Sequence, residues 1–443
     1  MTIYALSSGP GISGIAVIRL SGKETSDIIR LLTGKEVPKP RIATLRKINK
    51  INTSELIDEG LILWFPGPES YTGEDMAEIQ VHGSKAVVDA LHSSMSQIEN
   101  CRLAEPGEFT KIAFQNNKID LVKAESIGDL IHAETELQRE QAANLVQGHA
   151  SKYYENLREK LVKSLSYIEA KIDFAEDDLP GSVLKEVQKS IKQVHVDIKQ
   201  ILEDQKVGEK IRDGFRISII GDVNAGKSSL LNLLAKRDAA IVSEEEGTTR
   251  DVVETYLNID GYPVILADTA GIRKAKNKVE KEGIKRAIKK AKEADLTLVI
   301  IDVTKKTINK DVKKLINKDC ILVFNKSDLS RKTPKNEFSK NDQILISVKN
   351  SKNINKLIKK IKEKLSKKFM KANNILVTRE RHRAKLNAAL KEIEKFLKKD
   401  QKKEIETAAE DLRLATRHLG SIVGKVDVEE ILGSIFQDFC IGK

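Results

Sequence analysis

The spacing of apolar residues changes three times along the chain. In residues 1–118, short apolar or alternating runs predict β-strands, and runs with apolar residues three or four apart predict helices. The predicted strands are residues 15–20, 61–65 and 77–82, and the predicted helices are residues 26–32, 85–98 and 110–116. Residues 102–109 are expected to be extended. This first stretch is therefore expected to be a mixed α/β domain.

Glycine and proline become scarce after residue 118, and the apolar spacing becomes helical. Long helices are predicted at residues 119–146, 153–174 and 187–202 before residue 210, and at residues 379–397, 405–419 and 428–439 near the C-terminus. An acidic segment at residues 173–180 separates two of them. Both stretches are expected to be all-helical.

Between the two helical stretches, aliphatic strands alternate with helices. Strands are predicted at residues 215–220, 252–259, 262–267, 296–303, 320–325 and 343–347, and helices at residues 229–235, 281–293 and 354–369. Asp260-Gly261 predicts a hairpin turn between two of the strands. This pattern favours a largely parallel sheet with helices on both faces, inserted into a helical domain whose halves pack together.

The predicted organisation is thus multidomain. It consists of an α/β N-terminal domain at residues 1–118, a helical domain at 119–213 and 374–443, and an inserted α/β domain at 214–373.

Composition adds three constraints. The net charge of +12 suits an acidic partner such as RNA or a nucleotide, although a lysine-rich, solvated surface would give the same value. Cys101, Cys320 and Cys440 are far apart, so neither a disulfide framework nor a cysteine metal site is expected. Because the chain has neither a signal-like start nor a run of about 20 apolar residues, no membrane span is predicted and a cytoplasmic location is expected.

The candidate chemistry centres on Gly221-Asp222-Val223-Asn224-Ala225-Gly226-Lys227-Ser228, which fits the phosphate-binding pattern G-x-x-x-x-G-K-[ST]. A predicted strand precedes it and a predicted helix follows it, which is the context that this pattern needs. Backbone N–H groups and the helix N-terminus can then surround a phosphate. Lys227 would reach the outer phosphates, and the Ser228 hydroxyl would bind Mg²⁺.

Two later segments suit the same phosphates. Residues 247–251 supply Thr249 for Mg²⁺ and the terminal phosphate. Residues 268–271 end a predicted strand, where Asp268 can hold Mg²⁺ through water and the Gly271 N–H can contact the last phosphate.

Two further segments predict that the base is guanine. Residues 325–328 end a strand with Asp328, whose carboxylate can accept hydrogen bonds from the guanine N1–H and exocyclic amine. Adenine lacks both donors at that edge, so a site built on these bonds discriminates by about 10⁴ or more. Residues 347–349 would close over the guanine. The set favours GTP over ATP.

The water-positioning glutamine of Ras-like sites has no counterpart here, because Ile272 follows residues 268–271. Glu280 is a carboxylate within plausible reach, although spacing alone does not distinguish it from an ordinary solvated glutamate.

With these motifs assembled, the chain resembles the MnmE (TrmE) family of tRNA uridine-5-carboxymethylaminomethyl modification GTPases over essentially its whole length. The matching segments are residues 17–22, 64–68, 71–75, 106–110, 224–232, 247–251, 268–273 and 439–443. Residues 7–14, Ser243 and Val348 depart from the usual family pattern.

The resemblance implies a homodimer with a folate-binding-like N-terminal domain and GTPase domains that activate each other by meeting. It implies a K⁺-dependent GTPase in which K⁺ is bound by Asn224, Ser243, Glu245 and Thr248, Mg²⁺ is bound by Ser228 and Thr249, and Glu280 and Lys227 are catalytic. The full set of expected GTP-binding residues is Asn224, Ala225, Gly226, Lys227, Ser228, Ser229, Ser243, Glu244, Glu245, Glu246, Gly247, Thr248, Thr249, Asp268, Thr269, Ala270, Gly271, Asn325, Lys326, Asp328, Ser347, Val348 and Lys349.

The resemblance also implies a one-carbon donor, 5-formyl- or methylene-tetrahydrofolate, bound by Arg19, Glu78, Lys118 and Lys443. Without the resemblance, each of these residues would be interpreted as part of a surface salt bridge. The implied reaction adds a carboxymethylaminomethyl or aminomethyl group to C5 of the tRNA wobble uridine, together with an MnmG (GidA) partner that carries FAD. Cys440 is either part of the modification centre or a small buried residue.

Two other functions fit parts of the pattern. A GTP-switched RNA or ribosome assembly factor would suit the basic charge, but it leaves the N-terminal segments and the last residues unexplained. A folate enzyme with a regulatory GTPase differs from the leading interpretation mainly in whether turnover requires tRNA.

Overall fold

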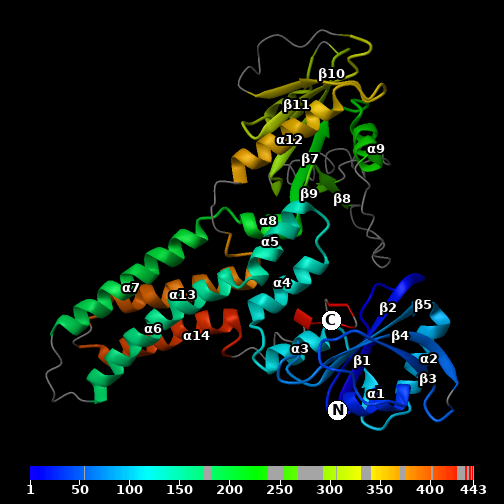
Figure 1. The fold of residues 1–443 in the computed structure, drawn as a ribbon. Coiled ribbons are helices and arrows are strands. Elements are labelled where there is room, and N and C mark those ends of the chain that lie inside the picture. The colour runs from blue at the N-terminus through cyan, green and yellow to red at the C-terminus, as the bar shows by residue number, and fades with distance from the viewer. Residues whose placement is uncertain are drawn as a thin grey trace, which may run out of the picture. The chain divides into compact units, whose positions relative to one another are not determined.

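The computed structural model describes residues 1–53, 55–173, 181–237, 254–267, 293–305, 307–330, 341–369, 375–400, 403–426, 435–436, 439–440 and 442 (Figure 1). The chain divides into two compact units. The first unit comprises Met1–Gly128, Leu145–Lys163 and Thr416–Lys443, and the second comprises Asp129–Asn144 and Ser164–Ala415.

The first unit contains a six-stranded sheet with the order β3-β4-β5-β2-β1-β6. Its strands are β1 (Thr2–Leu6), β2 (Ser13–Ser21), β3 (Thr44–Asn49), β4 (Leu56–Phe65), β5 (Met76–Gly83) and β6 (Cys101–Leu103), and its helices include α1 (Thr25–Thr33), α2 (Lys85–Met95) and α3 (Glu108–Gln115). Only the β1–β6 pair is parallel. The predicted α/β character is confirmed. Strands β1 and β3 were missing from the sequence-based prediction, and β6 forms at the start of the segment that was expected to be extended.

Alternation along β2 and β5 separates the two faces of this sheet. Ile18 and Ile79 pair across the strands and lie in the core that α1 and α2 cover. The next pair, Arg19 and Glu78, points to the other face. That face carries a smaller core that includes Phe109 of α3, so two charged side chains lie beside apolar ones.

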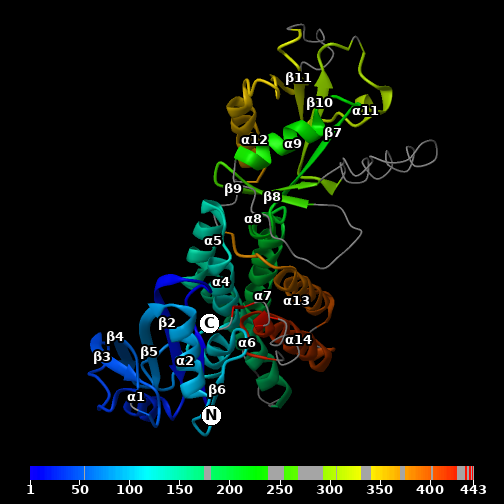
Figure 2. The same ribbon diagram turned by 90° about the vertical axis from the view of Figure 1, so that its right-hand side faces the viewer.

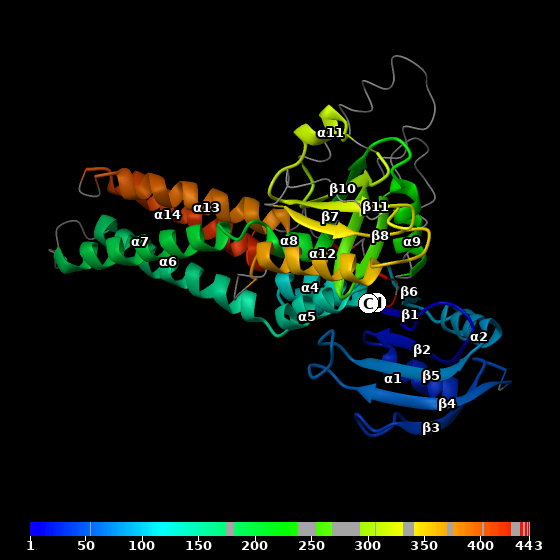
Figure 3. The ribbon, with the colours of Figure 1, turned by 90° about the horizontal axis from the view of Figure 1, so that it is seen from above.

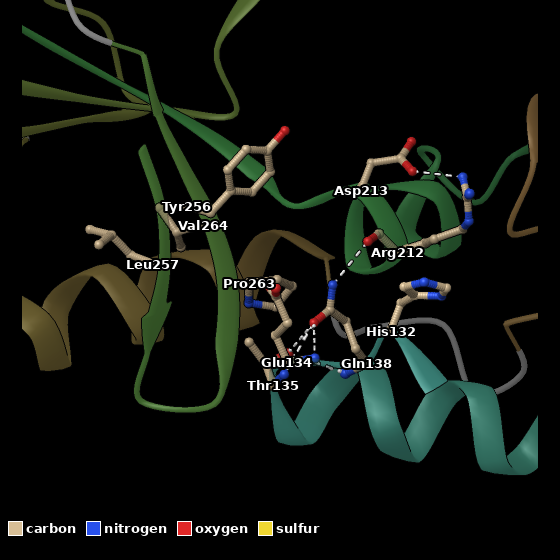
Figure 4. A pocket seen from close by; sticks show the side chains of 10 residues that line it. All are labelled: His132, Glu134, Thr135, Gln138, Arg212, Asp213, Tyr256, Leu257, Pro263 and Val264. Atoms are coloured by element: carbon tan, nitrogen blue, oxygen red, sulfur yellow. Dashed lines mark hydrogen bonds and ion pairs between the residues drawn. The ribbon is translucent and has the colours of Figure 1, made fainter. Parts of the chain in front are cut away.

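The single helix predicted over residues 119–146 is wrong, because two helices form there, α4 (Leu121–Ile131) and α5 (Glu136–Val146). The Thr135 hydroxyl accepts from the Gln138 N–H at 3.4 Å, and the Gln138 side chain accepts from the Thr135 N–H at 3.1 Å. This reciprocal pair is a capping box, which starts a new helix. Figure 4 shows Gln138 also reaching the Arg212 carbonyl oxygen, at 2.9 Å.

The remaining long helices are α6 (His149–Asp173), α7 (Gly181–Leu202), α13 (Glu380–Lys398) and α14 (Ile405–Val423), with a short α8 (Val207–Asp213) after α7. In the second unit α7 packs along α13 (Figure 3). Buried Arg383 of α13 donates to Glu209 of α8 at 2.6 Å and to Asp204 at 2.7 Å. Helices from before and after the α/β region therefore pack together, as the sequence pattern predicts.

The second unit also contains a six-stranded sheet with the order β12-β11-β10-β7-β9-β8 (Figure 2). Its strands are β7 (Phe215–Gly221), β8 (Glu254–Ile259), β9 (Tyr262–Ala267), β10 (Leu296–Asp302), β11 (Cys320–Asn325) and β12 (Asp342–Leu345), with helices α9 (Lys227–Arg237), α11 (Lys310–Lys314) and α12 (Ile354–Phe369). All pairs are parallel except β8–β9. Both Asp260 and Gly261 have positive φ, at 51° and 90°, which confirms the predicted hairpin turn.

Cores on both sides of this sheet explain its continuous apolar strands. Every residue of β10 and β11 is buried, as expected for parallel strands covered on both faces. One face packs against α9 and α12 through residues such as Leu230 and Leu357. Because the carboxyl ends of β7, β10, β11 and β12 share one edge, the segments that follow these strands converge there.

Two of the predicted helices, residues 281–293 and 428–439, fall largely outside the described residues. Within the described part of the chain, no helix is long and apolar enough to cross a membrane. The three cysteines form no disulfide.

Gly208 offers a test of the junction between α8 and the segment before α13. A Cβ at Gly208 would lie 1.9 Å from the Val377 carbonyl oxygen. We expect Gly208→Ala to destabilise the second unit by about 1–3 kcal/mol, seen by circular dichroism as a lower thermal midpoint. Gly9→Ala is the matched control, because nothing lies within 4 Å of its added methyl group. Equal midpoints for both variants would show that this junction is not tightly packed.

Candidate nucleotide site

The phosphate-binding loop joins the end of β7 to the start of α9, as the motif requires. Asn224 and Gly226 adopt left-handed backbone conformations, with φ of 63° and 102°. A Cβ on Gly226 would lie 2.2 Å from the Asn325 side-chain nitrogen, so only glycine fits where the loop meets β11. Ser228 lies in the first turn of α9, where the helix N-terminus favours an anion nearby.

The Lys227 ammonium group is held at the mouth of this loop. Its Nζ donates to the carbonyl oxygens of Gly221 and Asp222, each at 2.8 Å. Burial lowers the pKa of Lys227; the Asp222 carboxylate opposes this effect, and the positive charge of Lys305 adds to it. Negative phosphates at the loop would stabilise the ammonium form, so this environment suits a cation that balances phosphate charge.

Asn325 connects the loop to the predicted base-recognition segments. Its side-chain amide donates to the Ala225 carbonyl oxygen at 2.9 Å and accepts from the Val348 N–H at 3.1 Å. Asn325 is buried at the carboxyl end of β11. The Asn325 side chain therefore fixes the phosphate-binding loop and residues 347–349 relative to each other.

The Asp328 side chain is oriented by a hydrogen bond from Ser347. The Ser347 hydroxyl donates to Asp328 Oδ1 at 2.6 Å, and this bond holds the pKa of Asp328 below its usual range. Ser347 Oγ in turn accepts from the Asn350 N–H at 3.2 Å. Asp328 is thus an ionised acceptor in a defined orientation, as recognition of the guanine N–H groups requires.

The sequence prediction missed a third acidic position at this edge. Asp302 ends β10 and pairs in register with Asn325 of β11. It accepts from Lys326 Nζ at 2.6 Å. Burial opposes its ionisation, but hydrogen bonds from Lys326 and Thr304 outweigh burial and lower the pKa of Asp302. The position of Asp302 at the end of an aliphatic strand was the signal available in the sequence.

Lys305 was missed as well. It lies just after β10, with Nζ 3.4 Å from the Val223 carbonyl oxygen and 3.7 Å from an Asp222 carboxylate oxygen. A second cation therefore lies beside the phosphate loop.

The described residues of the predicted GTP site thus gather at one edge of the sheet. The other predicted members lie outside the described residues: Ser243, Glu244, Glu245, Glu246, Gly247, Thr248, Thr249, Asp268, Thr269, Ala270, Gly271 and Glu280.

The first unit brings together part of the predicted folate set. Arg19 donates to Glu78 Oε1 through Nε at 3.1 Å and Nη2 at 2.8 Å. Their side chains are only 15% and 22% exposed, so this is a largely buried pair and not a surface salt bridge. The Arg19 guanidinium also lies 5.8 Å from the ring centres of Tyr71 and Phe109.

The C-terminal residues approach the same pair. The Gly442 carbonyl oxygen accepts from Ser7 Oγ at 2.8 Å and lies 3.4 Å from Arg19 Nη1. Cys440 is exposed, which contradicts the alternative that it is a buried packing residue. Lys118 is exposed and lies beside Gly73, whereas Lys443 is outside the described residues.

Comparison with known proteins assigns nearly the whole chain to one family. The family described as MnmE helical domain matches residues 121–440, and the family described as GTP-binding protein TrmE N-terminus matches residues 2–118. The tRNA modification GTPase MnmE of Pelagibacter ubique is 62% identical over 443 residues, covering 100% of both chains. The chain belongs to the MnmE family.

Other relatives in the MnmE family are similar over the same length. The tRNA modification GTPases MnmE of Paramagnetospirillum magneticum and Rickettsia bellii are 42% and 44% identical, covering 100% of this chain and 99% and 100% of theirs. Among solved structures, the G domain of the T. maritima FeoB iron transporter is 23% identical and covers 34% of this chain and 98% of that chain, with a TM-score of 0.26.

Membership in the MnmE family confirms the predicted GTPase activity and the multidomain fold. The described half of the predicted site places Lys227 and the N-terminus of α9 at the phosphate-binding loop, and Asp328 beside Ser347 at the same edge of the sheet.

The predicted contact of Asp328 with the base can be tested by one substitution. Asp328→Asn replaces an acceptor by an amide donor, while the Ser347 hydrogen bond to Oδ1 can persist. We expect GTP binding to weaken at least about 100-fold and xanthosine triphosphate, which carries a carbonyl oxygen in place of the guanine amine, to bind instead. Fluorescent-nucleotide titration measures both affinities. If GTP binding is unchanged, Asp328 does not contact the base.

Proposed function

We propose that this GTPase modifies tRNA. Together with an MnmG (GidA) partner that carries FAD, it adds a carboxymethylaminomethyl or aminomethyl group to C5 of the wobble uridine, using 5-formyl- or methylene-tetrahydrofolate as one-carbon donor. The observation that carries this proposal is full-length similarity to proteins named tRNA modification GTPase MnmE. The proposal includes a homodimer, a cytoplasmic location, and domains at 1–118, 119–213 with 374–443, and 214–373.

GTP hydrolysis would depend on positions in both parts of the site. Lys227 would balance charge on the outer phosphates, the hydroxyls of Ser228 and Thr249 would bind Mg²⁺, and Glu280 would orient the attacking water. The local geometry of Ser228, at the N-terminus of α9, suits a hydroxyl ligand beside a phosphate. Ile272 cannot orient water, which is why a carboxylate is needed in that role.

Asn224 is the residue that we assign to potassium. Its left-handed backbone, with φ of 63°, and its exposure place a carbonyl-bearing side chain on the outer surface of the phosphate loop. Ser243, Glu245 and Thr248 would complete the ligand set. A bound K⁺ would neutralise charge that develops between the β- and γ-phosphates, the role that an arginine finger has in other GTPases.

The Arg19–Glu78 pair is the core of the proposed folate site. A carboxylate can accept paired N–H groups of a pterin, and Arg19 fixes the orientation of Glu78 through two hydrogen bonds. Lys118 and Lys443 would bind the carboxylates of the glutamate tail. The contact between Gly442 and Arg19 supports the placement of the C-terminal residues, including Cys440, near this site.

The modification itself is tested by mass spectrometry of tRNA. We expect a strain that lacks this gene to lose the C5 group from its wobble uridines, and the wild-type gene to restore it. Glu78→Ala should fail to restore it while GTP hydrolysis by the purified variant remains, because Glu78 lies in the first unit. Unchanged wobble uridines in the deletion strain, combined with GTP-dependent binding to ribosomal subunits, would favour the assembly-factor alternative.

The potassium assignment is tested by exchanging cations. We expect GTP hydrolysis to be about tenfold or more faster in KCl than in NaCl. Asn224→Gly removes the side-chain carbonyl and still permits the left-handed backbone, so this variant should lose the difference between the salts and keep GTP affinity. Equal wild-type rates in the two salts would remove the proposed role of Asn224.

A further inference from the structure

Helix α12 carries two stripes of lysine with different surroundings. It contains seven lysines, and Ile354, Leu357, Ile361, Leu365 and Phe369 form its buried face. On one flank, Lys360 and Lys364 lie 3.6 and 2.8 Å from Asp342, and Lys368 lies 3.6 Å from Asp319. These acids neutralise that flank, so its lysines have a structural explanation.

The other flank opens onto a surface groove of about 660 Å³. Its lining includes Lys359, Lys362 and Lys367 of α12 and Arg237 at the end of α9, together with Asp260 and Glu363. Asp260 pairs with Lys362 at 2.8 Å. Arg237, Lys359 and Lys367 are exposed, and they leave the groove with an excess of positive charge.

The groove lies away from the nucleotide. The Asp260-Gly261 turn precedes β9, which runs parallel to β7, so the turn lies at the edge of the sheet opposite the phosphate loop. Helix α9 begins at that loop and ends at Arg237, its eleventh residue, about 15 Å further along its axis. A ligand of the groove therefore does not compete with GTP.

The distribution of charge fits a polyanion. Lys359 and Lys367 are two turns apart, about 12 Å along the helix axis, which is too long a span for one phosphate. The described lining contains no aromatic side chain on which a base could stack. Phosphate contacts without base contacts position a nucleic acid independently of its sequence.

We propose that this groove binds the phosphate backbone of RNA and is a docking surface for tRNA on the GTPase domain. The proposal rests on the proposed function, because it takes the RNA to be the modified tRNA. The alternative is that the exposed lysines are only a solvated surface. The two differ in salt dependence, because each phosphate contact releases counterions.

The test measures binding of fluorescein-labelled tRNA to the full chain by anisotropy between 50 and 200 mM KCl. The triple variant Arg237→Gln/Lys359→Gln/Lys367→Gln removes three groove charges. The slope of log K for association against log salt concentration is negative, and we expect its magnitude to be about 2.7 smaller in the variant. The increase from 50 to 200 mM KCl should therefore weaken wild-type binding about 40-fold more than variant binding. GTP affinity should be unchanged, which also reports folding.

The matched control removes three exposed charges elsewhere. Lys391→Gln/Lys398→Gln/Lys403→Gln alters α13 and the residues after it, and should keep the wild-type slope. An equal fall in the control, or an unchanged slope in the groove variant, would overturn the proposal. Loss of binding to phosphatidylglycerol vesicles in the groove variant, with an unchanged tRNA slope, would overturn it in favour of a membrane surface.

This experiment separates the two levels of the proposal. If the wild-type chain binds no tRNA at all, both the groove and the proposed direct contact with tRNA fail. If the wild-type chain binds tRNA and the deletion strain lacks the wobble modification, but the slopes are equal, only the groove assignment fails.

Discussion

The nucleotide site depends on the hydrogen bonds of one buried amide. Asn325 donates to the carbonyl of Ala225 in the phosphate loop and accepts from the N–H of Val348 in the base segment. Both bonds are possible because parallel strands place their carboxyl ends at one edge. A buried amide that lost either partner would carry an unsatisfied group, at a cost of about 1–3 kcal/mol. The positions of the phosphate-binding loop and of residues 347–349 are therefore fixed together.

A second buried polar group organises the helical region. Arg383 of α13 bonds to Glu209 of α8 and to Asp204, and so joins residues that are more than 170 positions apart in sequence. Buried charges are tolerated when they are paired in this way and are costly when one partner is removed. This network and the packing of α7 against α13 join the helices that precede the α/β region in sequence to a helix that follows it.

Charge is used differently in the two units. Arg19 in the first unit is neutralised by Glu78 and lies near two aromatic rings, so its charge is balanced within the unit and its two hydrogen bonds orient Glu78. Around the GTP site, Lys227 and Lys305 lie beside carbonyl oxygens at the phosphate loop. Along α12, the same residue type is either paired with acids or exposed to a groove. The basic residues behind the net charge of +12 thus lie in different local environments: some are paired with acids, some lie beside carbonyl oxygens and some are exposed.

Local patterns in the sequence determined most of the elements and much of the candidate site. The phosphate-binding motif between β7 and α9, the segment that ends in Asp328 and the Asp260-Gly261 hairpin could be predicted because each depends on residues that are close in the chain. The break before α5 was also encoded locally, in Thr135 and Gln138, but was masked by helical spacing on both sides. Strand β6 has only three residues, which is too few for a periodic signal.

Tertiary structure decided the relations between distant residues. Only the sheet brings Asp302 next to Asn325, only strand pairing places Arg19 opposite Glu78, and only the fold brings Gly442 to both Ser7 and Arg19. Spacing along α12 shows that its lysines form stripes, but the acids that neutralise one stripe come from β12 and the end of the loop before β11. Hydrogen bonds and ion pairs between segments depend on distances in space, which the sequence does not display.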